Sequence, residues 1–522
     1  MRRNWAALAA VLSLSTLALG ASGPPTVDDV NASIKKFTKV FDAVESNFAD
    51  PVDSDRAIYK GAIPGMLRTL DPHSNFFDPQ AYQLLREDQT GHYFGVGMMI
   101  GAPEGKVVVM YPFRGSPAFR AGIHPGDVIL AVNDKDAEKL DVGGVSAMLK
   151  GPRGTPAQIK VEREGNKEPL WFNVVRDEVP RNSVPHAFWL KPGIGYLRVE
   201  SFNENTSKEA EQALARLDET AMQGLILDLR DNPGGILQEA VAVADHFLHK
   251  GQLIVSHHGR ASQETKFVAK RGGYGREYPI VVLVNRGSAS AAEILAGALQ
   301  DHDRAWILGE NTFGKGLVQA PYSLSGDSAL LLTIAHYYTP SGRLIQRDYE
   351  HQSFYAYYSR NAGKNDLHDM KKTDSGRVVY GGDGISPDQK FVYPNLTRLE
   401  AELAGNLTFF FYAPEFFAGH KEPLQKTWQA DPATMKSFEE FAEKRGLHFT
   451  ASEFKADERW IQERLREQLL VTSLSKEDSE QVAFENDPEV QKALESLASS
   501  KALLAKGKPT VASGVRGTAL TE

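Results

Sequence analysis

The 522-residue sequence contains no cysteine, which excludes disulfide frameworks, thiolate zinc sites, iron–sulfur clusters and cysteine nucleophiles. It also lacks an excess of basic charge, because 59 lysines and arginines stand against 67 aspartates and glutamates. A net charge of −8 argues against a nucleic-acid partner, which a basic surface would attract. The hydrophobic share of 42% is ordinary for a globular protein, and the length suggests three or four domains at about 150 residues each.

Long hydrophobic runs are missing beyond the N-terminus. There, Arg2 and Arg3 precede an apolar run over residues 5–19 and a group of small residues, a pattern typical of a signal peptide over residues 1–22. An uncleaved membrane anchor is the alternative, although the run is short for about 30 Å of hydrocarbon. We therefore expect an exported protein of the periplasm or cell envelope whose mature chain does not span the membrane.

Changes of periodicity predict four further regions in a multidomain α/β protein. Residues 23–90 have apolar positions at helical spacing, and residues 91–177 form short strands between Gly and Pro turns, with one helix over 142–149. Residues 178–393 alternate strands with helices, which predicts a largely parallel sheet. Residues 394–522 are predominantly helical and end in a tail that we expect to be disordered.

Two serines lie in a small-residue turn between a predicted buried strand and a predicted helix. The turn has the sequence Gly-Ser-Ala-Ser over residues 287–290, and the helix begins around Ala291. A hydroxyl at such a junction is exposed at the carboxyl end of the strand, and the N–H of Ala291 points where an oxyanion would form. Ser288 and Ser290 also suit a helix cap, so this segment alone leaves nucleophile and cap open.

Lys315 lies between two glycines directly after a predicted strand, which is unusual for a solvated surface lysine. The glycines allow close backbone approach, so we expect a desolvated amine with a lowered pKa that can act as general base in a serine–lysine dyad. Gln319 lies on the same side of the extended segment and can orient the amine. The segment also fits the start of a phosphate-binding loop, but Gly316 stands where that loop needs Ser or Thr.

A pair of glycines ends another predicted strand, in the sequence Asp-Leu-Arg-Asp-Asn-Pro-Gly-Gly over residues 228–235. A glycine N–H carries no side chain that hinders a ligand, so we predict the N–H groups of Gly235 and Ala291 as oxyanion donors. A plain strand-to-helix turn is the alternative. No metal or cofactor is predicted, because the histidines lack ligand spacing, and the adjacent His257 and His258 suit a surface.

These motifs occur in an order that resembles the carboxy-terminal processing (tail-specific) serine proteases from about residue 26 to 392. The segments that carry the resemblance are residues 70–74, 115–118, 121–127, 228–235, 287–290, 314–319, 338–343 and 384–388. Each motif alone is weak, but the ordered set is specific. The resemblance says little about the polar insertion over residues 349–380 or the region after 394.

The resemblance implies a ClpP/crotonase-like α/β protease core with a PDZ-like β-rich domain and helical N- and C-terminal regions. In that family the second serine of the Gly-Ser-Ala-Ser motif is the nucleophile, which implies Ser290 rather than Ser288. The family's lysine base and supporting glutamine fall on Lys315 and Gln319.

The β-rich module is implied to be a PDZ-like domain that binds the free C-terminus of a protein or peptide substrate. The substrate adds as a strand beside the helix over 142–149, and a loop binds its carboxylate through backbone N–H groups. A purely structural β-domain is the alternative. The predicted carboxylate-binding loop consists of Tyr93, Phe94, Gly95, Val96 and Gly97.

The predicted function is therefore a cell-envelope serine endopeptidase that cleaves proteins recognised by their C-terminal tails. An adaptor protein is kept as a candidate partner, and no nucleic acid, metal or cofactor is expected. The alternative is a non-catalytic PDZ binding or scaffold protein on a protease fold. Substitution at position 290 or 315 would mark such a protein, but Ser290 and Lys315 are both present.

Overall fold

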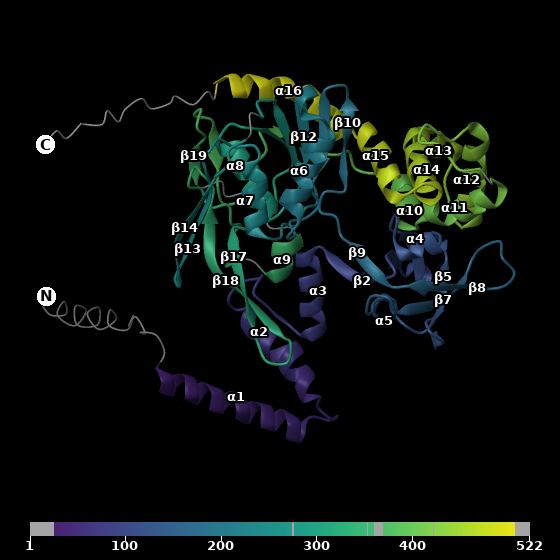
Figure 1. The fold of residues 1–522 in the computed structure, drawn as a ribbon. Coiled ribbons are helices and arrows are strands. Elements are labelled where there is room, and N and C mark those ends of the chain that lie inside the picture. Colours follow the sequence, from purple (N-terminus) through teal and green to yellow (C-terminus); the bar gives the residue numbers. More distant parts are fainter. Residues whose placement is uncertain (1–25, 274–275, 352, 360–368, 421, 507–522) are drawn as a thin grey trace, which may run out of the picture. The chain divides into compact units, whose positions relative to one another are not determined.

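The computed structural model describes residues 26–506 except 274–275, 352, 360–368 and 421 (Figure 1). The predicted signal peptide, the predicted tail and part of the 349–380 insertion lie outside the described residues. The chain divides into one unit that ends at Phe76 and a second that begins at Phe77. Among the described helices, none has both the length and the apolar character that a membrane span needs.

The N-terminal unit is helical, as its periodicity predicts. It contains α1 (Val27–Asn47), a π-helical segment (Arg56–Ala62) and α2 (Ile63–Leu67), and the short strand β1 (Asn75–Phe77) lies at its end. Thr26 begins α1 with a capping box, because its N–H donates to the Asp29 carboxylate at 3.0 Å and its hydroxyl accepts the Asp29 N–H at 3.3 Å.

The β-rich module follows α3 (Pro79–Thr90) and is built on an antiparallel sheet in the order β3-β4-β5-β7-β8, with β6 paired to β5. A separate pair joins β2 to β9. The predicted helix is α5 (Val142–Leu149), and a shorter helix is α4 (Pro117–Ala121). The strands are β2 (His92–Gly95), β3 (Met98–Gly101), β4 (Val108–Pro112), β5 (Val128–Val132), β6 (Lys135–Asp136), β7 (Pro156–Glu162), β8 (Leu170–Val175) and β9 (Asp177–Pro180).

The α/β region contains a six-stranded sheet in the order β10-β11-β12-β15-β16-β21, parallel except for β10. The predicted alternation of strands and helices is therefore confirmed. Its strands are β10 (His186–Lys191), β11 (Ile194–Arg198), β12 (Gly224–Asp228), β15 (Ile280–Val284), β16 (Trp306–Gly309) and β21 (Gln389–Lys390). Its helices are α6 (Thr206–Arg216), α7 (Leu237–Asp245) and α8 (Ala291–Asp301).

A second, antiparallel sheet in this region was not predicted. It pairs β14 with β13, β13 with β18, and β18 with β17. These strands are β13 (Leu253–Gly259), β14 (Ser262–Val268), β17 (Leu317–Ser323) and β18 (Ala329–Tyr338). After them come α9 (Phe354–Ser359) and the hairpin of β19 (Met370–Lys372) and β20 (Val378–Tyr380). The hairpin of β17 and β18 matters for the site because it carries Gln319 and Tyr337.

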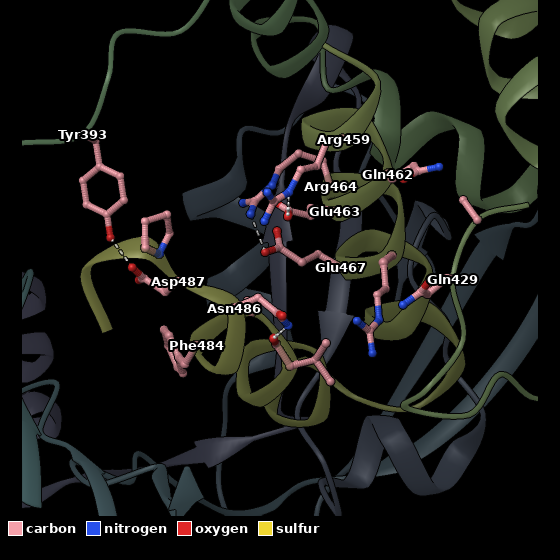
Figure 2. A pocket seen from close by; sticks show the side chains of 15 residues that line it. Tyr393, Gln429, Arg459, Gln462, Glu463, Arg464, Glu467, Phe484, Asn486 and Asp487 are labelled. Atoms are coloured by element: carbon pink, nitrogen blue, oxygen red, sulfur yellow. Dashed lines mark hydrogen bonds and ion pairs between the residues drawn. The ribbon is translucent and has the colours of Figure 1, made fainter. Parts of the chain in front are cut away.

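The C-terminal region is helical, as predicted. Its helices are α10 (Arg398–Gly405), α11 (Thr408–Gly419), α12 (Pro432–Lys444), α13 (Ala451–Ala456), α14 (Glu458–Ser473), α15 (Lys476–Asn486) and α16 (Pro488–Lys506). A cavity of about 610 Å³ lies between α14, α15 and the segment around Gln429, and Figure 2 shows its lining side chains. Ser290 and Lys315 do not line this cavity.

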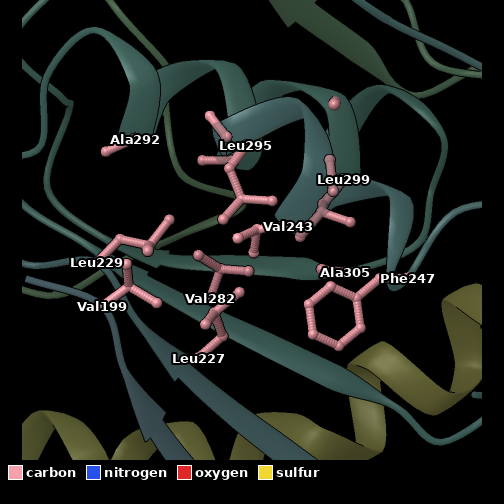
Figure 3. Packing of buried hydrophobic residues seen from close by; sticks show 14 of the residues in the cluster. Val199, Leu227, Leu229, Val243, Phe247, Val282, Ala292, Leu295, Leu299 and Ala305 are labelled. Atoms are coloured by element: carbon pink, nitrogen blue, oxygen red, sulfur yellow. The ribbon is translucent and has the colours of Figure 1, made fainter. Parts of the chain in front are cut away.

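Both faces of the six-stranded sheet are buried. On one face, alternate residues such as Leu227 and Val282 pack against Val243 of α7 and Leu295 of α8 (Figure 3). On the other face, the intervening residues, such as Val281, pack against α16. A sheet that is covered on both faces exposes its strand ends, and ligands of such sheets bind at the carboxyl ends.

Candidate active site

The two candidate serines have different environments in the turn between β15 and α8. Ser288 is fully buried, and its hydroxyl donates to the Leu229 carbonyl at 2.7 Å and accepts the Asn285 N–H at 3.0 Å. The bond to Leu229 connects the turn to the residue that follows β12, and the bond from Asn285 closes the turn itself. Ser290 is only partly buried and lies directly before α8. Whereas the Ser288 hydroxyl holds the turn to the segment after β12, the Ser290 side chain faces the first turn of α8, where it forms a capping box with Glu293.

Ser290 has an unusual backbone conformation, with φ of 53° and ψ of −113°. Side chains other than glycine rarely adopt positive φ, and such residues cluster at functional sites. A strained serine between a strand and a helix is also the arrangement by which hydrolases expose a nucleophilic hydroxyl. The turn therefore has the geometry that a nucleophile requires.

The loop after β16 holds Lys315 in a densely packed environment. Its Nζ donates to Oε1 of Gln319 at 2.7 Å, so the structure brings these two predicted residues together. A Cβ on Gly314 would lie 3.1 Å from the Gly384 backbone nitrogen, and one on Gly316 would lie 2.9 Å from that of Gln346. The close approach that the sequence predicts for this loop is confirmed.

The buried carboxylate of Glu293 connects the serine turn with the lysine loop. Its Oε2 accepts the N–H of Ser290 at 2.8 Å and of Lys315 at 2.9 Å. Its Oε1 accepts the N–H of Gly314 at 2.7 Å and the Thr312 hydroxyl at 2.5 Å. Burial raises the pKa of Glu293, whereas these donors act to lower it. One side chain thus fixes both backbone segments.

Tyr337 of β18 makes a second connection between the same segments. Its buried hydroxyl contacts the Ser290 carbonyl at 3.1 Å and also donates to the Lys315 carbonyl. Sequence reasoning missed both connecting residues. The Ser-x-x-Glu spacing from Ser290 to Glu293 is that of a capping box, so the sequence could have indicated that Glu293 contacts the Ser290 backbone. Tyr337 gave no such signal, because its role depends on strand pairing.

The glycine pair after β12 lies against the serine turn. A Cβ on Gly234 would lie 2.8 Å from Cβ of Ser290 and 2.9 Å from the Ala291 nitrogen. The Gly234 N–H donates to Asn232 Oδ1 at 2.8 Å, while the Gly235 N–H donates to no other residue that the structure describes. Ala291 is the first residue of α8, where N–H groups have no partner within the helix. Gly234 and Ala291 thus lie beside Ser290, whereas a Cβ on Gly235 would meet the Phe202 backbone. The oxyanion role of Gly235 and Ala291 stays a prediction.

The five residues of the predicted carboxylate-binding loop fall into two groups. Tyr93, Phe94 and Gly95 lie in β2 and pair with β9, whereas Val96 and Gly97 connect β2 to β3. In the sheet as described, β3 is an edge strand. An edge strand beside a helix is the arrangement to which a peptide adds. The role of the five residues stays a prediction.

One cluster has the residue types of a metal site. Ligand atoms of His186, Glu200 and Glu480 lie within 4.8 Å of one another. Protein cations already pair with both carboxylates, because Arg198 Nε lies 3.3 Å from Glu200 Oε1 and Lys476 Nζ lies 2.9 Å from Glu480 Oε1. We therefore interpret the cluster as an ion-pair network.

Comparison with known proteins gives consistent matches. The sequence model of Peptidase family S41 matches residues 193–350, and that of the PDZ domain matches residues 108–163. The carboxy-terminal-processing protease of Bartonella bacilliformis is 35% identical over 345 residues, which cover 65% of this chain and 79% of that protein. The carboxyl-terminal-processing protease of Synechocystis is 40% identical over 294 residues, which cover 55% of this chain and 68% of that protein.

A solved structure also matches, that of a photosystem II D1 C-terminal processing protease. It is 31% identical and covers 69% of this chain and 88% of its own, with a TM-score of 0.37.

Replacement of Glu293 tests whether its carboxylate fixes the site. In Glu293→Gln an amide NH₂ group faces backbone N–H donors, so we expect peptide hydrolysis to fall by about a hundredfold or more, as for an oxyanion-hole donor. The free energy of unfolding should fall by roughly 2–3 kcal/mol, because hydrogen bonds to a buried charge are lost. The measurements are kcat/KM and urea unfolding.

Glu310→Gln is the matched control, because Glu310 follows β16 but forms an exposed ion pair with Arg286. It should retain activity and stability. Hydrolysis by Glu293→Gln at the wild-type rate would contradict the role of the carboxylate.

Proposed function

Because the chain belongs to the carboxy-terminal processing proteases, a family of serine peptidases with a PDZ domain, we propose that Ser290 is its nucleophile and Lys315 its general base. The observation that supports this proposal is the pair of connections between the two residues. Glu293 accepts the N–H groups of both, and Tyr337 contacts both carbonyls. The nucleophile and base therefore have a fixed spacing that does not depend on their own side chains.

In the proposed reaction, Oγ of Ser290 attacks the scissile carbonyl carbon while its proton moves to the neutral amine of Lys315. The resulting ammonium gives that proton to the leaving amine, and an acyl ester remains on Ser290. Water then hydrolyses the ester, with Lys315 again as base. The N–H groups of Gly235 and Ala291 stabilise the oxyanion in both steps.

Gln319 supports the base in this proposal. A free lysine has a pKa of about 10.4 and is almost fully charged at neutral pH, so the amine must be held where it can lose a proton. Oε1 of Gln319 accepts from Nζ at 2.7 Å without adding a negative charge. A carboxylate at this position would favour the ammonium and disable the base.

We propose that the PDZ domain recognises the free C-terminus of protein substrates. The substrate's last residues would add to the edge of β3 beside α5, with the terminal carboxylate near Val96 and Gly97. We also propose export to the cell envelope, on the strength of the Arg2-Arg3 pair and the apolar run that follows. An adaptor protein remains a candidate partner.

Paired serine variants test the nucleophile. Ser290→Ala should abolish hydrolysis of an unfolded protein substrate and change stability by only about 1 kcal/mol, the usual effect of a hydroxyl at a helix start. Ser288→Ala should retain hydrolysis per folded molecule but lose about 1–3 kcal/mol, because it leaves buried hydrogen-bonding groups unpaired. Activity assays and thermal unfolding measure both. Hydrolysis that survives Ser290→Ala would contradict the assignment.

Amidation of a substrate's C-terminus tests recognition by the PDZ domain. The amidated peptide loses the negative charge that the loop is proposed to bind, so we expect KM to rise about tenfold or more, since hydrogen bonds to a charged group contribute roughly 1.5–3 kcal/mol. The control is a peptide amidated on an internal glutamate. Equal kcat/KM for free and amidated tails would contradict the recognition role of the PDZ domain. It would not affect the assignment of Ser290 as the nucleophile.

A further inference from the structure

The C-terminal helical region contacts the segment between the end of β12 and the glycine pair Gly234-Gly235. Helix α16 lies on the six-stranded sheet, where Val490 and Ala493 are fully buried. Ser500 fixes it farther along, because its hydroxyl accepts the Ile280 N–H at 3.0 Å and donates to the Ile280 carbonyl at 2.8 Å. The junction of α15 and α16 therefore has a defined place at the edge of the sheet where β12 ends.

At that edge the junction supplies two carboxylates to Arg230, two residues beyond β12. Nη1 of Arg230 donates to Oδ2 of Asp487 and to Oε2 of Glu489, each at 2.8 Å. The same nitrogen lies 2.8 Å from the Tyr393 hydroxyl oxygen. This hydroxyl in turn donates to Asp487 at 2.6 Å, as Figure 2 shows. The guanidinium is only 7% exposed, so it depends on protein groups for its hydrogen bonds.

The other side of the Arg230 guanidinium contacts Asp228, the last residue of β12. Nη2 donates to Oδ2 of Asp228 at 2.6 Å, and Nε lies 3.0 Å from both carboxylate oxygens. Burial alone would raise the pKa of Asp228, but Arg230 and Arg198 lower it to about 2. The Arg230 side chain is thus held between the strand end and the C-terminal helices.

Hydrogen bonds join the main chain on both sides of Arg230 to the serine turn. The carbonyl of Leu229 accepts the Ser288 hydroxyl at 2.7 Å, and the carbonyl of Asn232 accepts the Ala289 N–H at 2.8 Å. The side chain of Asn232 then accepts the Gly234 N–H at 2.8 Å. A displacement of Arg230 would therefore move both the serine turn and the Gly235 N–H that follows Gly234.

We propose that Asp487 and Glu489 are positioning residues for catalysis, which act through Arg230 on the segment that carries the Gly235 oxyanion donor. This inference rests on the proposed function, because it needs Gly235 to act on the oxyanion. It gives the C-terminal helical region a part in the reaction in addition to covering the sheet.

The two carboxylates have distinct positions in this arrangement. Glu489 is 2% exposed, and a Cβ on Gly309 at the end of β16 would lie 2.9 Å from its Oε1. Burial raises the pKa of Glu489 to about 7, and Arg230 acts in the opposite direction. Asp487 also begins α16, because its Oδ1 accepts the Glu489 N–H at 2.8 Å. Glu489 is therefore the better residue to replace, since its side chain has no part in this cap.

The test compares full-length wild type with Glu489→Gln, which keeps the side-chain shape and removes the charge. Ser290 is titrated with a fluorophosphonate so that rates refer to competent sites. We expect kcat to fall by about ten- to a hundredfold, less than the 10²–10³ for loss of an oxyanion donor, with KM nearly unchanged. Affinity for a peptide boronate, which places an oxyanion in the site, should fall in parallel. Glu489→Asp should restore part of kcat.

The control is Glu495→Gln, the same change on an exposed residue of α16 that pairs with Lys492. It should leave kcat and boronate affinity unchanged. A kcat per titrated site for Glu489→Gln within twofold of wild type would overturn the inference, as would a loss confined to KM. If Glu489→Gln does not fold, Asp487→Asn and Glu489→Asp are measured by the same criteria. Wild-type hydrolysis that continues after the fluorophosphonate has labelled Ser290 would instead contradict the proposed function.

Discussion

The arrangement of the site depends on the hydrogen bonds that the buried carboxylate of Glu293 accepts. Ser290 belongs to the turn after β15 and Lys315 to the loop after β16, and nothing in their own side chains requires a fixed separation. Glu293 accepts the N–H groups of both residues, and its burial makes these hydrogen bonds stronger than they would be in water. The strained backbone of Ser290, with φ of 53°, persists because its surroundings determine it in this way.

The parallel sheet places every segment of the site at one edge. The strands β12, β15 and β16 are neighbours, so the glycine turn, the serine turn and the lysine loop that follow them lie together. Because both sheet faces are covered, by α7 and α8 on one side and by α16 on the other, the strand ends have little freedom. The C-terminal helices also supply carboxylates to Arg230 at this edge, so the region outside the matched family segment takes part in the architecture of the site.

Local pattern was sufficient for much of the fold. The helix over 142–149, the buried strand before the Gly-Ser-Ala-Ser turn and the helix that begins at Ala291 are found as predicted, because each is a strongly patterned segment with clear ends. The second sheet was missed because β14 is mostly exposed and lacks a buried alternation. The residues themselves could not separate Ser288 from Ser290, since the deciding contact joins Ser288 to Leu229, 59 residues away. The contacts of Glu293 with Gly314 and Lys315 are likewise non-local.

The central claim is that Lys315 takes the proton of Ser290, and Lys315→Arg tests it most directly. The guanidinium keeps the positive charge but cannot be deprotonated in a protein. The measurement is kcat/KM across pH for wild type and variant, with folding checked by circular dichroism. We predict a folded Lys315→Arg protein without hydrolysis at any pH, and a wild-type acid limb that reports an apparent pKa well below 10. Substantial hydrolysis by Lys315→Arg would contradict the account, because another group would then have to accept the proton.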